Sequence, residues 1–458
     1  MRKRGDGCRV AGLLGLVSLV SLMSGSAAAQ VAETFGLADH RLPVVEKAES
    51  RPLSERLGLD LDAGRDLVGQ VMLPPVDVER LLEEDAAQEP WDKVLRWGVG
   101  RDIAVEMTDG VWHDLPGLGR LWVVDVVAAE AMAMRIQFSD MNLPEGAQLY
   151  AYSVADSTKV AGPYAGTGLF DTGEFWGPTL LGDQVRIELF VPRAADLQVG
   201  MHHRYFRVGR IQHMYRDPVQ EAFLKGEFGD ERGAGSCHND VSCYPGWADV
   251  AKASAGIGWV NSNSLWCSGT MLNTTANDQT PYWLTANHCL STAGDAQSAE
   301  IYWLYQRNGC GGSIPSVASV PQSATCQLMG TGSASDYTLL MIRGELPTGL
   351  FWAGWYSGTV SNGQDTACIH HPSGDYKRIS FGTKGSNTTN FVRINWYDGP
   401  TEPGSSGSGI FRTNTQQLYG QLCCGISACG SETWDDYGYF FRSYPNISSL
   451  LAAGSDDN

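Results

Sequence analysis

Three short segments contain the residue types that together can activate a hydroxyl group. In chain order they supply the imidazole of His288, the carboxylate of Asp336 and the hydroxyl of Ser406. A serine hydroxyl is a weak nucleophile until a neighbouring base removes its proton, and histidine titrates near neutral pH. A buried carboxylate fixes the imidazole tautomer and stabilises the imidazolium that forms. These residues therefore predict catalysis by a Ser406 nucleophile, with His288 as general base and Asp336 as its orienting acid.

The sequence around the first two residues favours strands that position them. His288 follows an apolar, strand-like run, and Asp336 precedes another. A disulfide between Cys289 and Cys267, on the preceding predicted strand, would fix the loop that holds the imidazole. The chain order His, Asp, Ser is that of chymotrypsin-like proteases, whereas α/β-hydrolases have Ser, Asp, His and subtilisins have Asp, His, Ser.

The serine lies in a Gly-Ser-Ser-Gly turn. Glycine lets the backbone turn tightly, so the N–H groups of Gly404 and Ser406 can converge on a developing oxyanion. Ser405 is the alternative nucleophile, and His370 and His371 are the alternative bases. A proline follows the two histidines, which favours a structural or rim role for them.

The amino terminus has the composition of a secretory signal peptide. A basic start, a short apolar centre and small residues up to Ala29 predict cleavage after Ala29. The alternative is a membrane anchor, but the apolar run is short for a bilayer and rich in Gly and Ser. We therefore expect a secreted, extracellular protein with no membrane association after signal cleavage.

The net charge bears on the possible partners, and the positions of the cysteines indicate where disulfides form. The chain has 458 residues, room for two or three domains, and a formal net charge of −18, which argues against nucleic acid as a partner. Of eleven cysteines, Cys8 lies in the predicted signal peptide and the others lie between Cys237 and Cys429. In a secreted chain this clustering predicts a disulfide framework confined to the C-terminal half.

The chain divides into four predicted segments. Residues 1–29 are the signal peptide, and residues 30–95 are a charged, partly helical propeptide segment. Residues 96–232 alternate β-prone runs with turns, which predicts a β-sandwich-like propeptide domain that ends, from residue 211, in an exposed polar connector. Residues 233–458 are rich in glycine, serine and short strands, which predicts an all-β protease domain.

The cysteine-free domain between a signal peptide and a disulfide-rich catalytic domain is most simply a propeptide. Latent synthesis as a zymogen lets a cell export a protease safely. We expect the break between the two after Arg232. The alternative is a permanent accessory domain that binds cell wall or substrate.

The motifs TANHC around His288, SDYTLL around Asp336 and TEPGSSGSGIF at 401–411 resemble those of the bacterial lysyl endopeptidases. This family is a branch of the chymotrypsin-like serine proteases, and the resemblance extends over nearly all of residues 233–442. It implies a chymotrypsin-like double β-barrel, with two perpendicular six-stranded barrels and the cleft between them. It also implies the triad already named, with Ser406 as the nucleophile.

The resemblance implies three disulfides, Cys237–Cys429, Cys243–Cys310 and Cys267–Cys289. The uncharged Ser405 before the nucleophile can form no ion pair with a freed amine. The disulfide of Cys237, close to the expected new amino terminus, could tether that terminus instead. Four cysteines remain, and their even number predicts two further bonds of unknown connectivity: Cys326, Cys368, Cys423 and Cys424.

In the resembling family, a carboxylate near the end of the domain holds the ammonium of the substrate lysine. Asp435 matches that position, with Asp436 as the alternative, and a buried carboxylate there would favour a cationic side chain. Either could instead be a solvated loop charge. Cys423 replaces a histidine of the family, and a tryptophan-bearing loop before the nucleophile is missing. We therefore expect cleavage after lysine, with arginine also accepted.

Residue counts give a second indication of specificity. The predicted mature domain has three lysines and six arginines, a bias that would protect a lysine-specific enzyme from self-digestion. The expected break after Arg232 fits instead an arginine-tolerant enzyme or processing by another protease.

The sequence therefore predicts a secreted serine endopeptidase, a monomer, that acts on protein or peptide substrates and interacts with its own propeptide. No metal or organic cofactor is implied, and no HExxH spacing supports a metalloprotease. The alternatives are a protease of this fold that prefers another type of residue before the cleaved bond, or a catalytically silent binding protein. A silent protein would have lost at least one triad residue, and none is missing.

Overall fold

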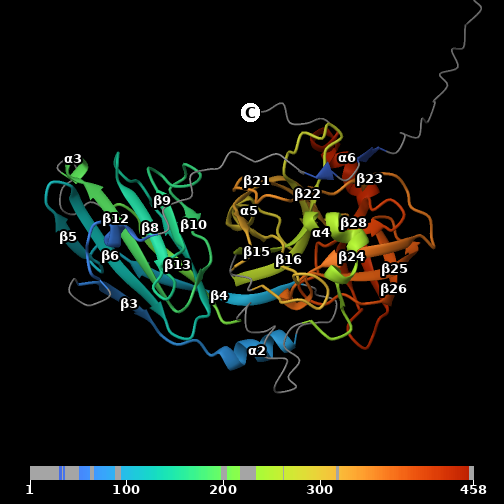
Figure 1. Ribbon diagram of the computed structural model, residues 1–458, viewed down its shortest axis with the longest axis horizontal. Helices are drawn as coiled ribbons and strands as arrows, with labels where there is room; N and C mark the ends of the chain where they lie inside the picture. Colours follow the sequence, from blue (N-terminus) through green and yellow to red (C-terminus); the bar gives the residue numbers. More distant parts are fainter. Residues whose placement is uncertain are drawn as a thin grey trace, which may run out of the picture.

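The computed structural model describes residues 30–32, 35–36, 51–61, 67–87, 94–196, 204–216, 234–260, 263–315 and 319–452. Their strands form two bodies, and a single strand, β4 (Leu95–Val105), runs from one into the other (Figure 1). The predicted signal peptide and the expected break after Arg232 lie outside the described residues. No helix in the described part of the chain is long and apolar enough to cross a membrane.

The first body is the β-sandwich that the alternating runs predict. Its strands are β3 (Gly69–Leu73), β4, β5 (Val111–Leu115), β6 (Gly119–Ala128), β7 (Ala133–Ser139), β8 (Gln148–Ser153), β9 (Val160–Tyr164), β10 (Phe175–Trp176), β11 (Leu180–Leu181), β12 (Gln184–Pro192) and β13 (Arg207–Met214). One sheet has the order β3-β6-β12-β8-β9, and the other includes β10-β7-β13-β4. Side chains from both sheets, such as Trp122, Ile136 and Leu189, form one apolar core.

Three short helices accompany the sandwich. They are α1 (Leu53–Arg56), α2 (Val78–Ala86) and α3 (Arg193–Asp196). Asp77 caps α2 by accepting a hydrogen bond from the Arg80 N–H, which satisfies one of the free donors at the helix start. The charged segment before residue 95 is therefore partly helical, but it also contributes β3 to the sandwich.

The prediction of an exposed connector from residue 211 is wrong for its first residues. Ile211 to Met214 complete β13, which lies between β4 and β7, and Gln212 and His213 have no exposed surface. The polar composition was misleading because Gln212 accepts a hydrogen bond from the Ser264 hydroxyl of the second body. Burial, with Arg101 nearby, lowers the pKa of His213 to about 4.

The second body begins with an open half-barrel. Its strands are β15 (Ser254–Val260), β16 (Asn263–Leu272), β17 (Tyr282–Ala286), β18 (Glu300–Tyr302), β19 (Gln322–Ala324), β20 (Cys326–Gly332) and β21 (Tyr337–Ile342). They are hydrogen-bonded in the order β20-β21-β17-β16-β15-β18-β19. The short helices α4 (Ala248–Ala253) and α5 (Ala293–Ser298) lie in the same part of the chain.

A closed six-stranded barrel follows. It consists of β24 (Asp365–His370), β25 (Arg378–Asn387), β26 (Phe391–Asp398), β27 (Gly409–Arg412), β28 (Leu418–Gly425) and β29 (Trp434–Tyr439). The circuit β28-β27-β24-β25-β26-β29 closes because β29 also pairs with β28. One expected barrel is therefore complete and the other is a half-barrel, within the predicted chymotrypsin-like all-β class.

Smaller elements join these parts. The C-terminal helix α6 (Phe440–Leu451) buries Phe440 and Ile447 in a core shared with strands of both halves. The shared core holds the half-barrel and the barrel in one relative position, as a site between them requires. Short edge pairs add β1 (Val31–Ala32) to β23 (Trp355–Tyr356), β2 (Phe35–Gly36) to β22 (Phe351–Trp352), and β14 (Asn239–Asp240) to β25.

Candidate active site

Two neighbouring strands bring His288 and Asp336 together. β17 and β21 are antiparallel with Ala286 opposite Tyr337, so His288 leaves one strand beside the entry to the other. The Asp336 carboxylate accepts hydrogen bonds from the His288 backbone N–H (2.9 Å) and from its Nδ1 (2.7 Å). Asp336 has φ of +51°, a left-handed conformation that aspartate tolerates better than most residues. One carboxylate thus orients both the ring and the backbone of the histidine.

The serine completes the chain of contacts. Ser406 Oγ lies 2.8 Å from His288 Nε2, and the Ser406 carbonyl accepts a hydrogen bond from the Ser268 N–H (2.8 Å). The next residue, Gly407, has φ of +79°, and a Cβ there would lie 2.1 Å from Thr285 Oγ1. Glycine is therefore required after the serine, because a larger residue would push the hydroxyl away from the imidazole.

The loop before the serine presents two backbone donors. Within the described residues, the N–H groups of Gly404 and Ser406 have no hydrogen-bond acceptor. Gly404 has φ of +93°, and a Cβ there would lie 2.8 Å from the His371 carbonyl oxygen. Free donors next to a candidate nucleophile are what an oxyanion hole requires.

Two of the alternative residues, Ser405 and His370, contact each other, whereas Ser406 contacts His288. Ser405 Oγ lies 2.7 Å from His370 Nδ1 and accepts a hydrogen bond from the Glu402 N–H (3.2 Å). His370 and His371 are both buried, and burial with neighbouring cations lowers the pKa of His371 to about 3. The other ring nitrogen of His370 lies 3.0 Å from the Ser380 hydroxyl, and Nδ1 of His371 lies 2.9 Å from the Asp375 carbonyl oxygen.

The structure contains the three disulfides that the resemblance implies, Cys237–Cys429, Cys243–Cys310 and Cys267–Cys289. The prediction of two further bonds is wrong. The remaining thiols are free because two are buried in different halves of the second body and two are neighbours on β28: Cys326, Cys368, Cys423 and Cys424. Burial raises the pKa of both buried thiols, Cys326 and Cys368, to about 12, which keeps them protonated.

Asp435 lies on β29 of the closed barrel and has no exposed surface. Its Oδ2 accepts hydrogen bonds from Trp396 Nε1 (2.6 Å) and Thr401 Oγ1 (2.7 Å), and its Oδ1 from the Ser427 N–H (3.3 Å). Gly425 packs over the carboxylate, since a Cβ there would lie 1.9 Å from Oδ1. These neutral donors hold the carboxylate in place.

The alternative residue, Asp436, has a basic partner. Both its oxygens accept hydrogen bonds from Arg393, at 2.9 and 2.8 Å. The pair is partly exposed, and Arg393 also lies over the Trp434 ring. Asp436 is therefore already paired with a cation at the surface, which makes it the weaker candidate for a buried pocket charge.

Two family models match this chain. "Lysyl endopeptidase, C-terminal domain" matches residues 232–441, and "Lysyl endopeptidase N-terminal domain" matches residues 72–201. A "Lysyl endopeptidase" of Pseudomonas aeruginosa is 27% identical over 390 residues, which cover 78% of this chain and 81% of the relative. The chain is a lysyl endopeptidase-like serine protease. The family models thus match both bodies of the structure.

Two solved structures align with part of this chain. An HtrA-type protease, AlgW with a tripeptide, aligns with a TM-score of 0.33 and 19% identity over 45% of this chain and 62% of that one. A thermostable serine protease, AL20, from an extremophilic microorganism aligns with a TM-score of 0.31 and 15% identity over 44% of this chain and 98% of its own.

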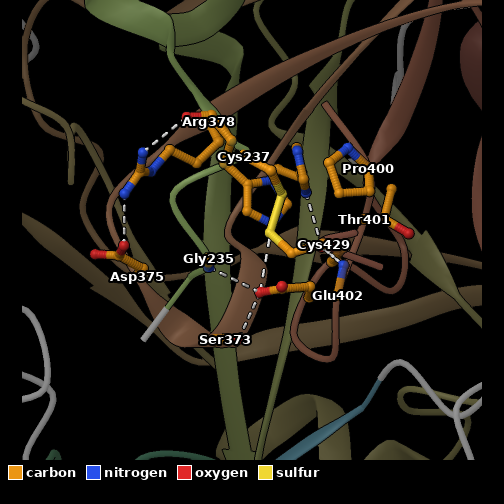
Figure 2. A network of polar contacts seen from close by, with 12 residues as sticks. Gly235, Cys237, Ser373, Asp375, Arg378, Pro400, Thr401, Glu402 and Cys429 are labelled. Carbon is orange, nitrogen blue, oxygen red and sulfur yellow. Dashed lines mark hydrogen bonds and ion pairs between the residues drawn. A yellow bond between two sulfur atoms is a disulfide. The ribbon is translucent and has the colours of Figure 1, made fainter. Parts of the chain in front are cut away.

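Glu402 is a partly buried acid near the proposed nucleophile that no local motif marks in the sequence. Figure 2 shows Glu402 beside the start of the second body, where its Oε2 accepts hydrogen bonds from the Gly235 N–H (3.4 Å) and Ser373 Oγ (3.0 Å) and lies 3.3 Å from His238 Nε2. Burial raises the pKa of Glu402, but these contacts outweigh it and hold the pKa below the usual value. The disulfide to Cys429 lies in the same network. The segment 234–238 is thus fixed to the serine loop.

The thiol of Cys423 lies beside the catalytic candidates of the protease. Its Sγ, an imidazole nitrogen of His288 and a carboxylate oxygen of Asp336 lie within 4.8 Å of one another. A second such group among the described residues, Cys237, His238 and Cys429, has both sulfurs in a disulfide and therefore offers no thiolate. In the first group the histidine and the aspartate already bond to each other, so the arrangement fits proton transfer better than metal binding.

Proposed function

We propose that this serine endopeptidase is secreted and cleaves peptide bonds after basic residues, with lysine preferred and arginine accepted. The observation that carries the proposal is the continuous chain of short contacts from Asp336 through His288 to Ser406, at 2.7 and 2.8 Å. A carboxylate, an imidazole and a hydroxyl in this order act as one unit in acyl transfer.

The proposed mechanism follows from these contacts. His288 Nε2 takes the proton of Ser406 as the oxygen attacks the substrate carbonyl, while Asp336 stabilises the imidazolium. The N–H groups of Gly404 and Ser406 donate to the oxyanion of the tetrahedral intermediate. The imidazolium then protonates the leaving amine. In the second half of the reaction His288 takes a proton from water as the water attacks the acyl-enzyme, and the imidazolium returns that proton to the leaving Ser406 oxygen, which releases the carboxylic acid product.

The proposed specificity depends on Asp435. Its carboxylate is buried near the serine loop and is oriented by hydrogen bonds from Trp396, Thr401 and Ser427. A substrate ammonium or guanidinium that enters the pocket would be attracted to this carboxylate in a low dielectric. A neutral side chain would gain no such attraction, which disfavours its binding.

We further propose that the sandwich is a propeptide and that residues 1–29 are a signal peptide. The sandwich precedes the catalytic body in the chain and has no cysteine, whereas the catalytic body has three disulfides. Disulfides persist in oxidising compartments, so this asymmetry supports export.

Labelling with an organofluorophosphonate tests the proposal. The processed enzyme should react covalently and lose peptide hydrolysis, and mass spectrometry should locate the adduct on Ser406. Ser405→Ala is the matched control and should label normally, whereas Ser406→Ala should not label. Equal labelling of the wild type and Ser406→Ala would remove Ser406 as the nucleophile.

A further inference from the structure

The two edges of β16 have different partners. β15 pairs with one edge, opposite residues 264–270. Three elements share the other edge in sequence: β4 opposite residues 263–266, the Ser406 carbonyl at the N–H of Ser268, and β17 opposite residues 270–272. The sandwich strand therefore begins directly beside the proposed nucleophile on the same strand edge.

The register gives the distance and the direction. Leu95 lies opposite Trp266, two residues before Ser268, and strands rise about 3.4 Å per residue, so β4 starts about 7 Å along the strand from the contact to Ser406. β4 is antiparallel to β16 and runs away from the serine. The leaving half of a cleaved peptide has this polarity, because its new amino terminus is generated at the serine.

The start of β4 is packed against the site. Val94 contacts the apolar cluster that contains Cys267 and Cys289, the disulfide beside His288. In the intact chain Ser406 has no exposed surface, although the His288 side chain is 29% exposed. In the sequence Val94 follows a lysine, the residue type that the proposed pocket selects.

Side chains on both bodies hold β4 in this place. Trp97, which bulges out of the β4–β16 register, lies 4.8 Å from the Trp266 ring and 6.0 Å from Tyr302, and all three are buried. Thr179 donates to the buried Glu300 through its N–H (2.9 Å) and its hydroxyl (2.6 Å). Glu300 would be hydrated once the sandwich left, so the surface suits a removable partner.

We propose that β4, in the uncut chain, occupies the edge of β16 at residues 263–266 in place of the leaving half of a peptide substrate. The sandwich then inhibits the protease by adding a strand where a substrate would add its own. The inference rests on the proposed function, because it requires peptide cleavage at Ser406.

A binding experiment on the full chain tests the inference. Ser406→Ala keeps the chain from cleaving itself, and mass spectrometry verifies that it is intact. The probe is a fluorescein-labelled peptide, Ala-Ala-Lys-Val-Leu-Arg, whose last four residues copy residues 93–96, and fluorescence anisotropy gives its Kd. Trp97→Ala and, as a milder change, Thr179→Val loosen β4 in this background. Trp112→Ala is the matched control, since Trp112 packs inside the sandwich against Tyr205.

We expect both interface variants to bind the peptide at least tenfold more tightly than the Ser406→Ala parent, and the Trp112→Ala control to bind like the parent. Equal affinity of the parent and both interface variants would overturn the inference, because β4 would then not compete with substrate. Failure of the proposed function is distinguishable, since the processed wild type would then not react with the fluorophosphonate.

Discussion

Two buried aspartates in this protein have different hydrogen-bond partners, and we propose different tasks for them. The Asp336 carboxylate accepts two hydrogen bonds from His288, so in the proposed mechanism its charge would stabilise an imidazolium one step away from the substrate. The hydrogen bonds that Asp435 accepts from Trp396, Thr401 and Ser427 come from neutral groups. We infer that Asp336 stabilises a cation that forms during the reaction, and that Asp435 attracts a cation that belongs to the substrate.

Replacing the Asp435 carboxylate of the proposed pocket by its isosteric amide should remove the proposed preference for basic residues. We expect Asp435→Asn to lower kcat/KM for lysyl peptides by about 10²- to 10³-fold, because removing one partner of a buried charge pair costs about 3–4 kcal/mol. Asp436→Asn is the control and should change kcat/KM less than about threefold, since its pair with Arg393 is partly exposed. Unchanged lysyl preference in Asp435→Asn, read from peptide-pool digests, would exclude the pocket role.

At the scale of elements, the site is assembled by strand register and by one loop. The register of β17 and β21 places His288 beside Asp336, and the hydrogen bond from Ser268 on β16 places Ser406 beside both. Glu402 then fixes the serine loop to the start of the second body through Gly235. The loop geometry thus depends on a segment far away in the sequence.

Loss of the Glu402 carboxylate should disturb the serine loop without touching the triad. We expect Glu402→Ala to lower kcat about tenfold with little change in KM, since one oxyanion donor contributes about 10²- to 10³-fold when it is lost entirely. Ser373→Ala removes only one partner of the carboxylate and is the milder control. A kcat in Glu402→Ala equal to that of the wild type would show that the loop holds itself in place.

The elements also show what a sequence can predict. His288, Asp336 and Ser406 each lie in a local motif, so their strands and turns could be predicted, and the structure brings the three together. Glu402 could not be assigned, because its role depends on a contact to Gly235, 167 residues away. The sequence predicts an exposed connector at the polar end of β13, and this is wrong because the neighbours that bury these side chains come from other strands.

At the scale of the whole molecule, β4 joins one sheet of the sandwich and the half-barrel into one twelve-stranded sheet. The sandwich fold could be predicted from alternating runs, but a strand that pairs with both bodies could not, because nothing in residues 95–99 specifies a partner outside the sandwich. The burial of Lys377 could not be predicted from the sequence for the same reason. Its Nζ donates hydrogen bonds to the Ala251 carbonyl and to Gln306 Oε1, and both acceptors are distant in the sequence.

Stability of the protein should therefore depend on pH through Lys377. Burial lowers its pKa from 10.5 to about 7 in the folded state. Between these values the unfolded chain binds more protons than the folded one, so the contribution of Lys377 to stability rises with pH. The free energy of unfolding of the wild type minus that of Lys377→Met should increase from pH 7 to pH 10, by up to about 1.4 kcal/mol per pH unit.

Urea denaturation at several pH values measures this difference. Lys252→Met is the matched control, because Lys252 forms a surface pair with Asp249 and should give a difference that hardly changes with pH. A constant difference for Lys377→Met across the same range would mean that the lysine keeps its proton in the folded protein.

The central claim is that His288 and Ser406 act as one catalytic unit, and the kcat values of two single variants and their combination test it most directly. We predict that Ser406→Ala and His288→Ala each lower kcat by about 10⁴- to 10⁶-fold, and that the double variant is no slower than the slower single one. If the two losses multiplied in the double variant, or if Ser406→Ala kept wild-type kcat, the account would be contradicted.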